Sequence, residues 1–505
     1  MPSTPRLGGE LLRLVTAGMY DNPLVLYREY IQNSADAIAA QGSGAGSVHV
    51  TIDPLQSQIT IRDDGTGLEP DEAARVLIDL GHSSKNPLTD RGFRGIGRLS
   101  GLAFADELHF TTRTCADLPP TRVSWNARIF RELDLTKVDA TTAIQETTTV
   151  SQVSSGEWPD RFFQVTIDRV NRHAASTLLN EEAVRNYLSE VCPVPLAPCF
   201  PLAPDILDFL KLHADYFVLD VRINDDPQPI ERPFRDAIPL TEQFRAPFQT
   251  VDTHVIPRPD ADEPAAILWL AHTPYAGSIP RRLGVRGLRA RSGNMQIGTD
   301  RIFEHLFLEP RFNGWCVGEI HILDTRIAPN GRRDYFEPGP HLRNLENHIG
   351  AIAQQVSSRC RQASSQRNKL RNVNAAVLRF DAARNLARSG YLSSAEATAL
   401  LVREQARIPA IRQTLAQVQA AGDDPAFESL SLCESEFESL ELNCPPKLDT
   451  VPAGSRAAIL SAFDTIARTL PPDSALALIE DIINQLRDRE WARYQDGTLF
   501  AQDGL

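Results

Sequence analysis

The stretch EYIQNSADAI, residues 29–38, decides how we expect the first part of the chain to fold. Its apolar residues recur at helical spacing, yet Glu29, Asn33 and Asp36 are spaced four and three residues apart and therefore lie along one stripe of the same helix. A buried carboxylate is costly unless something pairs with it, and a hydrated divalent cation is one such partner. Taken alone, the stripe fits a solvent-facing surface equally well.

A second motif, ITIRDDGTGL, occupies residues 59–68 and ends a predicted β-hairpin. The segments SVHVTID and SQITIRDD alternate apolar and polar residues around a turn near PLQ, which is typical of two paired strands. Asp63 closes the second strand, and Gly65 and Gly67 follow it. Such a carboxylate can accept a hydrogen bond from an exocyclic amine, while glycines let a flat base approach the backbone. By itself, this pattern is often only a turn.

The third motif is GHSSKNPLTDRGFRGIGRLSG, residues 81–101. Its glycines lead into a helix that we expect to begin about Leu99, so backbone N–H groups and the positive helix end can hold phosphate oxygens. A Walker-type loop is absent, and each motif is weak alone, but three in this order within about 70 residues are far more specific. The loop residues predicted at the phosphates are Ser84, Lys85, Gly92, Phe93, Arg94, Gly95, Ile96 and Gly97.

The composition, 42% hydrophobic and 23% charged over 505 residues, is that of a soluble globular protein. No apolar run approaches the roughly 18 residues of a membrane span, and the start MPSTPRLGGELLRL lacks a signal-like segment, so we expect a cytoplasmic protein without a membrane partner. The seven cysteines are scattered without CxxC spacing, which argues against a structural zinc site. The net charge of −13 argues against a broadly basic nucleic-acid surface.

The chain is too long for a single core, so several domains are expected. Two helices broken at the turn YDNP are predicted between residues 10 and 40, and another helix over 70–80. The predicted parts are an α+β domain over 1–175, a second α/β domain over 176–340, long helices forming hairpins over 341–421, an acidic and partly ordered linker over 422–447, and a C-terminal helical segment over 448–505.

The series YREYIQNSADAI, IRDDGTGL and GFRGIG resembles the nucleotide-binding boxes of the GHKL superfamily, which includes gyrase B, the ninety-kilodalton heat-shock chaperones, histidine kinases and MutL. The resemblance implies a Bergerat fold, an α/β sandwich that holds ATP and Mg²⁺ between helices and a mixed sheet under a flexible lid. We therefore expect an α+β chain: this sandwich, an α/β transducer-like middle domain, and an α-helical C-terminal region.

The resemblance also implies roles for the residues of the three motifs. Glu29 resembles the general base that activates the attacking water, and Asn33 resembles the magnesium ligand. Asp36 lies beside them at the nucleotide, and Asp63 matches the carboxylate that reads the adenine amine. The lid glycines around the phosphates correspond to Gly92, Gly95 and Gly97.

Within the superfamily, the chain most resembles the heat-shock chaperone branch, because LLRLVTAGMYDNPLVLYREYIQNSADAI is similar to it throughout and IAPNGRRDYFE resembles its middle-domain loop. That loop supplies an arginine to the γ-phosphate, which implies Arg333, with Arg332 as the alternative; a guanidinium presents a fixed fork of donors to phosphate. The lid is short, as in MutL, and Phe162 and Phe163 replace the usual Gly-Thr pair near the adenine. The resemblance covers roughly residues 7–340.

These observations favour an ATPase that works as a chaperone-like clamp, closing its lid and dimerising through its first domains when ATP binds. The expected partners are a second copy of the chain and a protein client. A DNA-handling clamp like MutL or the MORC proteins is the alternative, supported by the short lid and by the arginine-rich run RRLGVRGLRARSG, residues 281–293. That run is also compatible with a solvated strand-loop-strand. An ATP-switched module of a bacterial defence system is a third possibility.

Overall fold

The structure is a computed structural model that describes residues 22–42, 46–79, 97–153, 157–417, 429–432, 435, 448 and 455–495, with side chains as far as 487 in the last range. The chain divides into two compact units, Met1–Cys360 and Arg361–Leu505, which are described separately below. The predicted helix before the YDNP turn lies outside the described residues. So does most of the glycine loop.

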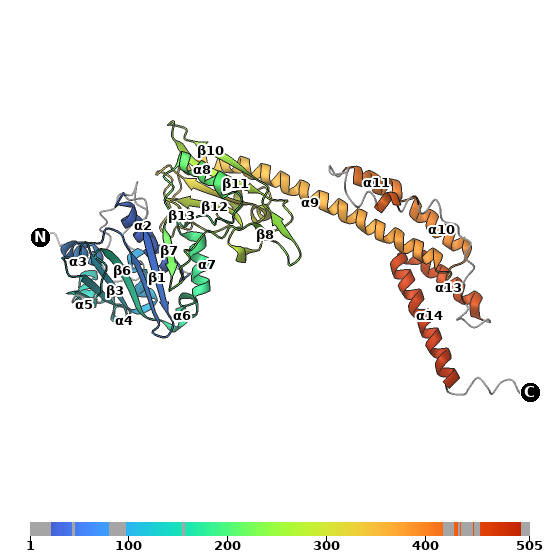
Figure 1. Cartoon of the computed structure of the whole chain (residues 1–505), viewed down its shortest axis with the longest axis horizontal. Coiled ribbons are helices and arrows are strands. Elements are labelled where there is room, and N and C mark those ends of the chain that lie inside the picture. The colour runs from blue at the N-terminus through green and yellow to red at the C-terminus, as the bar shows by residue number, and fades with distance from the viewer. Residues whose placement is uncertain are drawn as a thin grey trace, which may run out of the picture. The chain divides into compact units, whose positions relative to one another are not determined.

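The first unit begins with a seven-stranded mixed sheet in the order β5-β4-β3-β6-β2-β1-β7 (Figure 1). The predicted hairpin is confirmed, because β1 and β2 pair antiparallel from Val48 opposite Asp63 to Asp53 opposite Gln58. The last strand, β7, pairs parallel with β1. The strands are β1 (Ser47–Asp53), β2 (Gln58–Asp63), β3 (Ala105–Arg113), β4 (Thr121–Asn126), β5 (Thr148–Gln152), β6 (Phe162–Val170) and β7 (Asp220–Ile223).

The alternation of the hairpin sequence decides which side chains enter the core. Side chains two residues apart on a strand face the same side, and on β2 the residues Ile59, Ile61 and Asp63 are all buried. The first two join a hydrophobic cluster with residues of β1, β3 and β6. Asp63 therefore continues the row of core-facing positions and places a carboxylate on the covered side of the sheet.

Helices supply the rest of this core (Figure 1). The predicted second helix of the pair is α2 (Val25–Ala39), which buries Leu26, Ile31 and other apolar residues. The helix expected near Leu99 is instead a 3-10 helix, whose Gly101 N–H donates to the Tyr30 hydroxyl of α2 (3.0 Å). The other elements are α3 (Pro70–Ile78), η1 (Gly97–Ala103), α4 (Ala127–Glu132), α5 (Ala140–Thr147), α6 (Arg172–Leu178) and α7 (Glu181–Val191).

A second, five-stranded sheet follows in the order β10-β11-β14-β12-β13, with β12 and β14 parallel and the other neighbours antiparallel. Strand β11 packs Ile267 and Trp269 against the helix α8 and its surroundings. The elements of this region are α8 (Ala203–His213), β8 (Ala237–Pro239), β9 (Arg245–Pro247), β10 (Thr250–Pro257), β11 (Pro264–His272), η2 (Arg281–Leu283), β12 (Gly287–Ser292), β13 (Met295–Ile297), η3 (Glu304–Leu306), η4 (Pro310–Trp315) and β14 (Val317–Ile322).

The arginine-rich run over 281–293 is not a solvated segment in its second half. Arg289 and Arg291 on β12 are only 3% and 1% exposed. Their guanidinium groups form ion pairs with Glu190 (2.8 Å) and Glu319 (2.6 Å). Buried arginines require such partners, so these two side chains stabilise the interior and are not available to phosphates of DNA.

The core of the first sheet extends beyond residue 175, where we predicted the first domain to end. Strand β7 belongs to the sheet, and the hydrophobic cluster of this sheet includes residues as far as Ile230. The division between the two compact units comes later, after Cys360. The four boundaries between the five predicted segments stay predictions, and the parallel strand β7 returns to the first sheet after α7 and α8.

The second unit is helical where the structure describes it, as predicted. The helix α9 (Pro340–Arg388) is continuous over 49 residues; its part up to Cys360 belongs to the first unit and the rest to the second, where it is followed by α10 (Ser394–Gln405) and α11 (Ile408–Ala416). Phe380 of α9 packs with Ile408 and Leu415 of α11. The predicted final pair is α13 (Arg456–Thr469) and α14 (Pro472–Gln495). Most of the acidic segment over 422–447 lies outside the described residues.

Among the described helices, none is both long and apolar enough to span a lipid bilayer.

Candidate functional site

The helix α2 brings Glu29 into the interior of the first unit. The carboxylate is 7% exposed, and its Oε1 atom lies 3.1 Å from the guanidinium of Arg28, which is buried to the same extent. A buried carboxylate needs a cationic or hydrogen-bonding partner, and Arg28 supplies one. Glu29 is therefore held inside the protein as one member of a close ion pair.

The 3-10 helix η1 closes over this carboxylate. The Tyr30 hydroxyl donates to the Arg98 carbonyl (2.9 Å) and accepts from the Gly101 N–H (3.0 Å), which fixes η1 against α2. A Cβ atom added to Gly97 would lie 2.2 Å from Oε2 of Glu29, far inside van der Waals contact. Only glycine lets the end of the loop approach the carboxylate this closely.

Asp63 is the second buried acid of the site. Its Oδ2 atom accepts a hydrogen bond from the Ser34 hydroxyl on α2 (2.6 Å), and its Oδ1 atom accepts from the Gly65 N–H (2.9 Å). Burial raises the pKa of Asp63 to about 6, although these two hydrogen bonds lower it in part. Ionised Asp63 keeps unused lone pairs, so it can accept a further hydrogen bond from a ligand amine.

The two glycines after Asp63 are required by the backbone. A Cβ atom at Gly65 would lie 2.7 Å from Oδ1 of Asp63 and 2.8 Å from the Ala37 side chain. Gly67 has a φ of +67°, and a Cβ atom there would lie 2.2 Å from the Arg113 carbonyl oxygen. The DxGxG pattern therefore packs the chain closely beside the carboxylate, between α2 and β3. The predicted approach of a flat base to these glycines stays a prediction.

Asn33 and Asp36 lie further along α2, and both are half-buried. They share the helix with Glu29 and with Ser34, so the predicted polar stripe includes one fully buried acid and two partly accessible oxygen-bearing side chains. Carboxylate and carboxamide oxygens are the ligands that Mg²⁺ prefers. The stripe thus offers oxygen ligands at the accessible edge of the helix.

An arginine from the second sheet's region reaches Glu29. We call Pro329–Phe336 the arginine loop, because Pro329 and Phe336 form a β-bridge that closes it around the two arginines. Nε of Arg333 lies 3.9 Å from Oε1 of Glu29, and the Arg333 side chain is 12% exposed. Arg332, the alternative, is exposed. The loop therefore brings Arg333 to the predicted base.

The strand β6 lies beside Asp63 where the Gly-Thr pair was expected. Phe163 is directly opposite Asp63 in the sheet register, and Thr112 of β3 is opposite Phe163. Phe162 is fully buried and stacks on Trp158, with ring centroids 5.1 Å apart. The Thr112 hydroxyl donates to the Phe162 carbonyl (3.0 Å) and accepts from the Leu68 N–H (3.0 Å). The β6 side of Asp63 is therefore aromatic, and the Thr112 hydroxyl there is hydrogen-bonded to the backbone.

The glycine loop can be placed only at its end. Gly97 is described and lies at Glu29, as noted above. The remaining loop residues predicted at the phosphates lie outside the described residues: Ser84, Lys85, Gly92, Phe93, Arg94, Gly95 and Ile96.

Sequence reasoning missed two residues that organise the site. Arg28 pairs with Glu29, and Ser34 holds Asp63. The signal for Arg28 was its position next to the candidate base in the run YREY. The signal for Ser34 was weaker, because its partner is 29 residues away on β2 and the contact requires the helix to lie over the strand end.

The combined arrangement fits a purine nucleotide with its metal ion. A buried carboxylate with spare lone pairs suits an exocyclic amine, and the close packing at Gly65 and Gly67 holds the backbone beside it. A second carboxylate lies beside an arginine at the other end of the site. Accessible oxygen atoms on α2 between these two ends suit Mg²⁺. The donor set is that expected for phosphoryl transfer to water.

Comparison with known proteins also indicates a nucleotide site in this part of the chain. Residues 25–156 match the family described as "Histidine kinase-, DNA gyrase B-, and HSP90-like ATPase". The matched range contains α2, the hairpin with Asp63, and the glycine loop.

The chain is also similar to bacterial proteins named "Chaperone protein HtpG". It is 26% identical over 162 residues to the protein of Salmonella typhimurium strain LT2, covering 27% of this chain and 26% of that protein. It is 26% identical over 145 residues to the protein of Streptomyces coelicolor, covering 24% and 22%. The similarity therefore spans about a quarter of the length of these curated relatives.

Proposed function

We propose that this chain, whose residues 25–156 form an ATPase domain of the GHKL superfamily with distant similarity to the HSP90-like chaperones, binds ATP and hydrolyses it to drive a molecular clamp. The observation that supports hydrolysis best is the short distance between Nε of Arg333 and Oε1 of Glu29, 3.9 Å. The two residues come from the regions of two different sheets. A buried base and an arginine from a separate domain are parts that phosphoryl transfer to water needs.

The roles follow from the chemistry of each side chain. Asp63 accepts a hydrogen bond from the adenine amine and fixes the base. Glu29 accepts the proton of the attacking water, and Arg333 stabilises the negative charge that develops on the γ-phosphoryl oxygens. Gly97 brings the backbone end of the loop to the same place. The close Arg28 partner holds the Glu29 carboxylate in position before ATP arrives.

Asn33 would hold the Mg²⁺ ion, with Asp36 beside it at the accessible edge of α2. The ion supplies charge neutralisation for the β- and γ-phosphates when it is bound. The carboxamide of Asn33 provides one neutral oxygen ligand without adding a charge next to Glu29.

The proposed cycle couples these steps to movement. ATP closes the glycine loop as a lid, the first domains of two copies associate, and hydrolysis reopens the clamp. Turnover is slow if closure limits the rate. We propose a protein client, because the similar proteins are named as chaperones and because the last two arginines of the 281–293 run, Arg289 and Arg291, are buried.

The test measures binding and hydrolysis separately. Full-length protein is titrated with ATP in the presence of Mg²⁺ by calorimetry, and phosphate release is followed over time. Glu29→Gln keeps the shape of the side chain and removes the base, so it should bind ATP and fail to turn over. Arg333→Ala should slow turnover and spare affinity. If Glu29→Gln hydrolyses ATP at the wild-type rate, the assignment of the base is wrong.

The DNA-handling alternative has its own measurement. A clamp that contacts phosphates loses affinity for duplex DNA steeply as the salt concentration rises. The reason is that its binding releases cations condensed on the DNA, and this release is less favourable at high salt. We expect no salt-dependent binding to duplex DNA, and suppressed aggregation of an unfolded client protein in the presence of ATP. A steep salt slope without client protection would instead support the DNA-handling clamp.

A further inference from the structure

The arginine loop holds Arg333 in an uncommon backbone conformation. Arg333 has a φ of +57°, a region that residues with a Cβ atom rarely adopt. Two hydrogen bonds inside the loop support it: the Asn330 N–H donates to the Tyr335 carbonyl (2.9 Å), and the Arg333 N–H donates to the Asn330 carbonyl (3.1 Å). A strained conformation persists only where the surroundings determine it, so the loop needs external anchors.

One anchor is the turn that follows β13. The Gly298 N–H donates to the Arg333 carbonyl (2.8 Å), which ties the arginine's own peptide to the second sheet. Gly298 itself has a φ of +67°, and a Cβ atom there would lie 2.8 Å from the Asp334 carbonyl oxygen. The two backbones therefore approach too closely for any other residue at this position.

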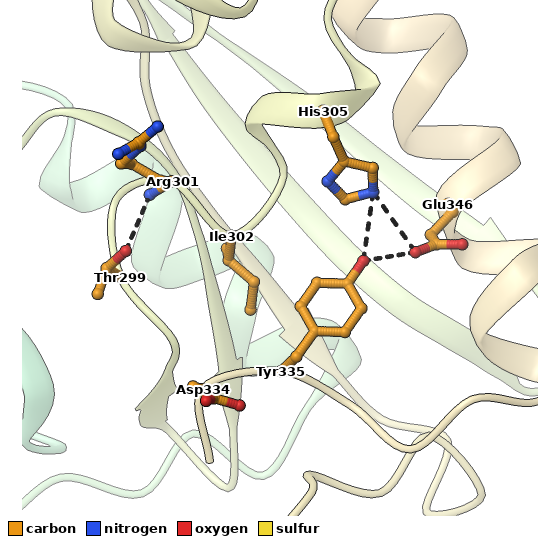
Figure 2. Close-up of a pocket in the computed structure, with 7 residues that line it drawn as sticks. All are labelled: Thr299, Arg301, Ile302, His305, Asp334, Tyr335 and Glu346. Carbon is orange, nitrogen blue, oxygen red and sulfur yellow. Dashed lines mark hydrogen bonds and ion pairs between the residues drawn. The ribbon is translucent and has the colours of Figure 1, made fainter. Parts of the chain in front are cut away.

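The other anchor is a side-chain cluster on the opposite flank of the loop, shown in Figure 2. The Tyr335 hydroxyl donates to Glu346 of α9 (2.5 Å), and the His305 ring lies 3.4 Å from the same hydroxyl. The cluster forms one wall of a cavity of about 510 Å³. Its lining residues are Thr299, Arg301, Ile302, His305, Asp334, Tyr335 and Glu346.

The Tyr335 hydroxyl stays protonated and can therefore always donate its hydrogen bond to Glu346. Burial and the hydrogen bond to Glu346 raise the pKa of Tyr335, so the hydroxyl keeps its proton at physiological pH. Hydrogen bonds to a carboxylate are stronger and shorter than neutral ones. The ring is also held from two sides, by the edges of Phe336 and His305.

We propose that Tyr335 is a positioning residue for ATP hydrolysis: its hydrogen bond to Glu346 fixes the arginine loop so that Arg333 reaches Glu29. The inference rests on the proposed role of Arg333 in hydrolysis. Tyr335 is two residues from the arginine and touches no reacting atom. It acts by limiting the positions that the loop can take, with the first turns of α9 as its support.

The experiment compares turnover and affinity in full-length variants. Tyr335→Phe removes only the hydroxyl, and Glu346→Ala removes its acceptor together with the carboxylate that lies 3.7 Å from Nε2 of His305. Each is expected to lower kcat for ATP about tenfold, the effect of one charge-assisted hydrogen bond, with the Kd for ATP and Mg²⁺ unchanged within about twofold. Glu346→Gln keeps an acceptor oxygen and should restore most of the rate. Tyr391→Phe, the same chemical change in the second unit, should leave both values unchanged.

A double-mutant cycle separates positioning from general destabilisation. In the Arg333→Ala background, Tyr335→Phe should cause no further loss of kcat, because the side chain that it positions is gone. Hydrogen exchange should also rise at the amide of Gly298 in Tyr335→Phe, since its acceptor is the Arg333 carbonyl. These two results, with the Glu346→Gln rescue, support the inference.

Three outcomes overturn it, and they are distinguishable. If Arg333→Ala hydrolyses ATP normally, the proposed role of the arginine fails and the inference fails with it. If Arg333→Ala is slow and Tyr335→Phe is as fast as wild type, only the positioning role fails. If Tyr335→Phe lowers kcat equally with and without Arg333, the tyrosine acts on the fold and not through the arginine.

Discussion

The raised pKa of Asp63 leads to a measurable pH dependence of adenine recognition. Only ionised Asp63 has the strong acceptor that the adenine amine needs. With a pKa of about 6, the ionised fraction falls from nearly all at about pH 7.5 to about one in eleven at about pH 5. The affinity for the base should therefore fall about tenfold over this range, equivalent to about 1.4 kcal/mol.

Adenosine is the ligand to use, because it has no phosphates whose own protonation would change binding. Its Kd is measured by calorimetry or NMR titration at the two pH values. Asp63→Asn is expected to bind adenosine weakly at both, with no slope. Asp53→Asn, at the other end of the same hairpin, should keep the wild-type slope. Equal affinity at both pH values in the wild type would refute the assignment of Asp63 as the base-reading group.

The raised pKa of Asp63 also determines how the free energy of unfolding changes with pH. The folded protein binds the Asp63 proton up to a pKa of about 6, whereas the unfolded chain releases it at about 3.8. The free energy of unfolding therefore decreases as pH rises through this window, by about 3 kcal/mol in total. Asp63→Asn removes this cost, so its unfolding transition at neutral pH should lie above that of the wild type, and the gap should vanish at low pH.

Three further predictions concern packing around the site and the second sheet. Gly97→Ala places a Cβ atom 2.2 Å from Oε2 of Glu29, so displacing that carboxylate should lower kcat about a hundredfold with adenosine affinity retained; a normal kcat would contradict the close approach. Ser34→Ala removes a 2.6 Å hydrogen bond to the carboxylate at the end of β2 and should weaken adenosine binding at pH 7 about fivefold; unchanged binding would show that the hydroxyl does not tune this acid. Glu319→Gln leaves two buried guanidinium groups without their charge partner. It should lower the free energy of unfolding, measured by thermal unfolding, by about 3–5 kcal/mol, whereas Glu242→Gln at an exposed position should leave it unchanged. Equal effects of the two substitutions would contradict the importance of the buried ion pairs.

The local elements of the first domain could be predicted because their signals are local. Alternation fixed the β1–β2 hairpin, and the three boxes placed Glu29, Asp63 and Gly97 in one region. The approach of Arg333 to Glu29 could be expected only through the family resemblance, because the two residues are about 300 positions apart and no spacing rule connects them. The order of the boxes predicts a nucleotide site, and the structure adds how closely the backbones at Gly65, Gly67 and Gly97 pack.

Other features could not be predicted from pattern alone. The segment near Leu99 has the sequence pattern of an α-helix, but it forms a 3-10 helix whose Gly101 N–H donates to the hydroxyl of Tyr30, 71 residues away in the sequence. The run around Arg289 and Arg291 reads as a basic surface, because a sequence does not show the buried acids that neutralise it. The parallel strand β7 returns to the first sheet from beyond α8, a long-range pairing that leaves no local trace.

Two buried arginines, Arg232 in the segment after β7 and Arg291 on β12, affect how the first unit can move. Arg232 and Arg291 share the Glu319 carboxylate. They also donate to the Val194 (3.1 Å) and Glu190 (2.7 Å) carbonyls at the end of α7. Pulling these regions apart would strand several charges in a dry interior. The segment after α7 is therefore a rigid connection and not a hinge. A displacement of either sheet is transmitted to the other.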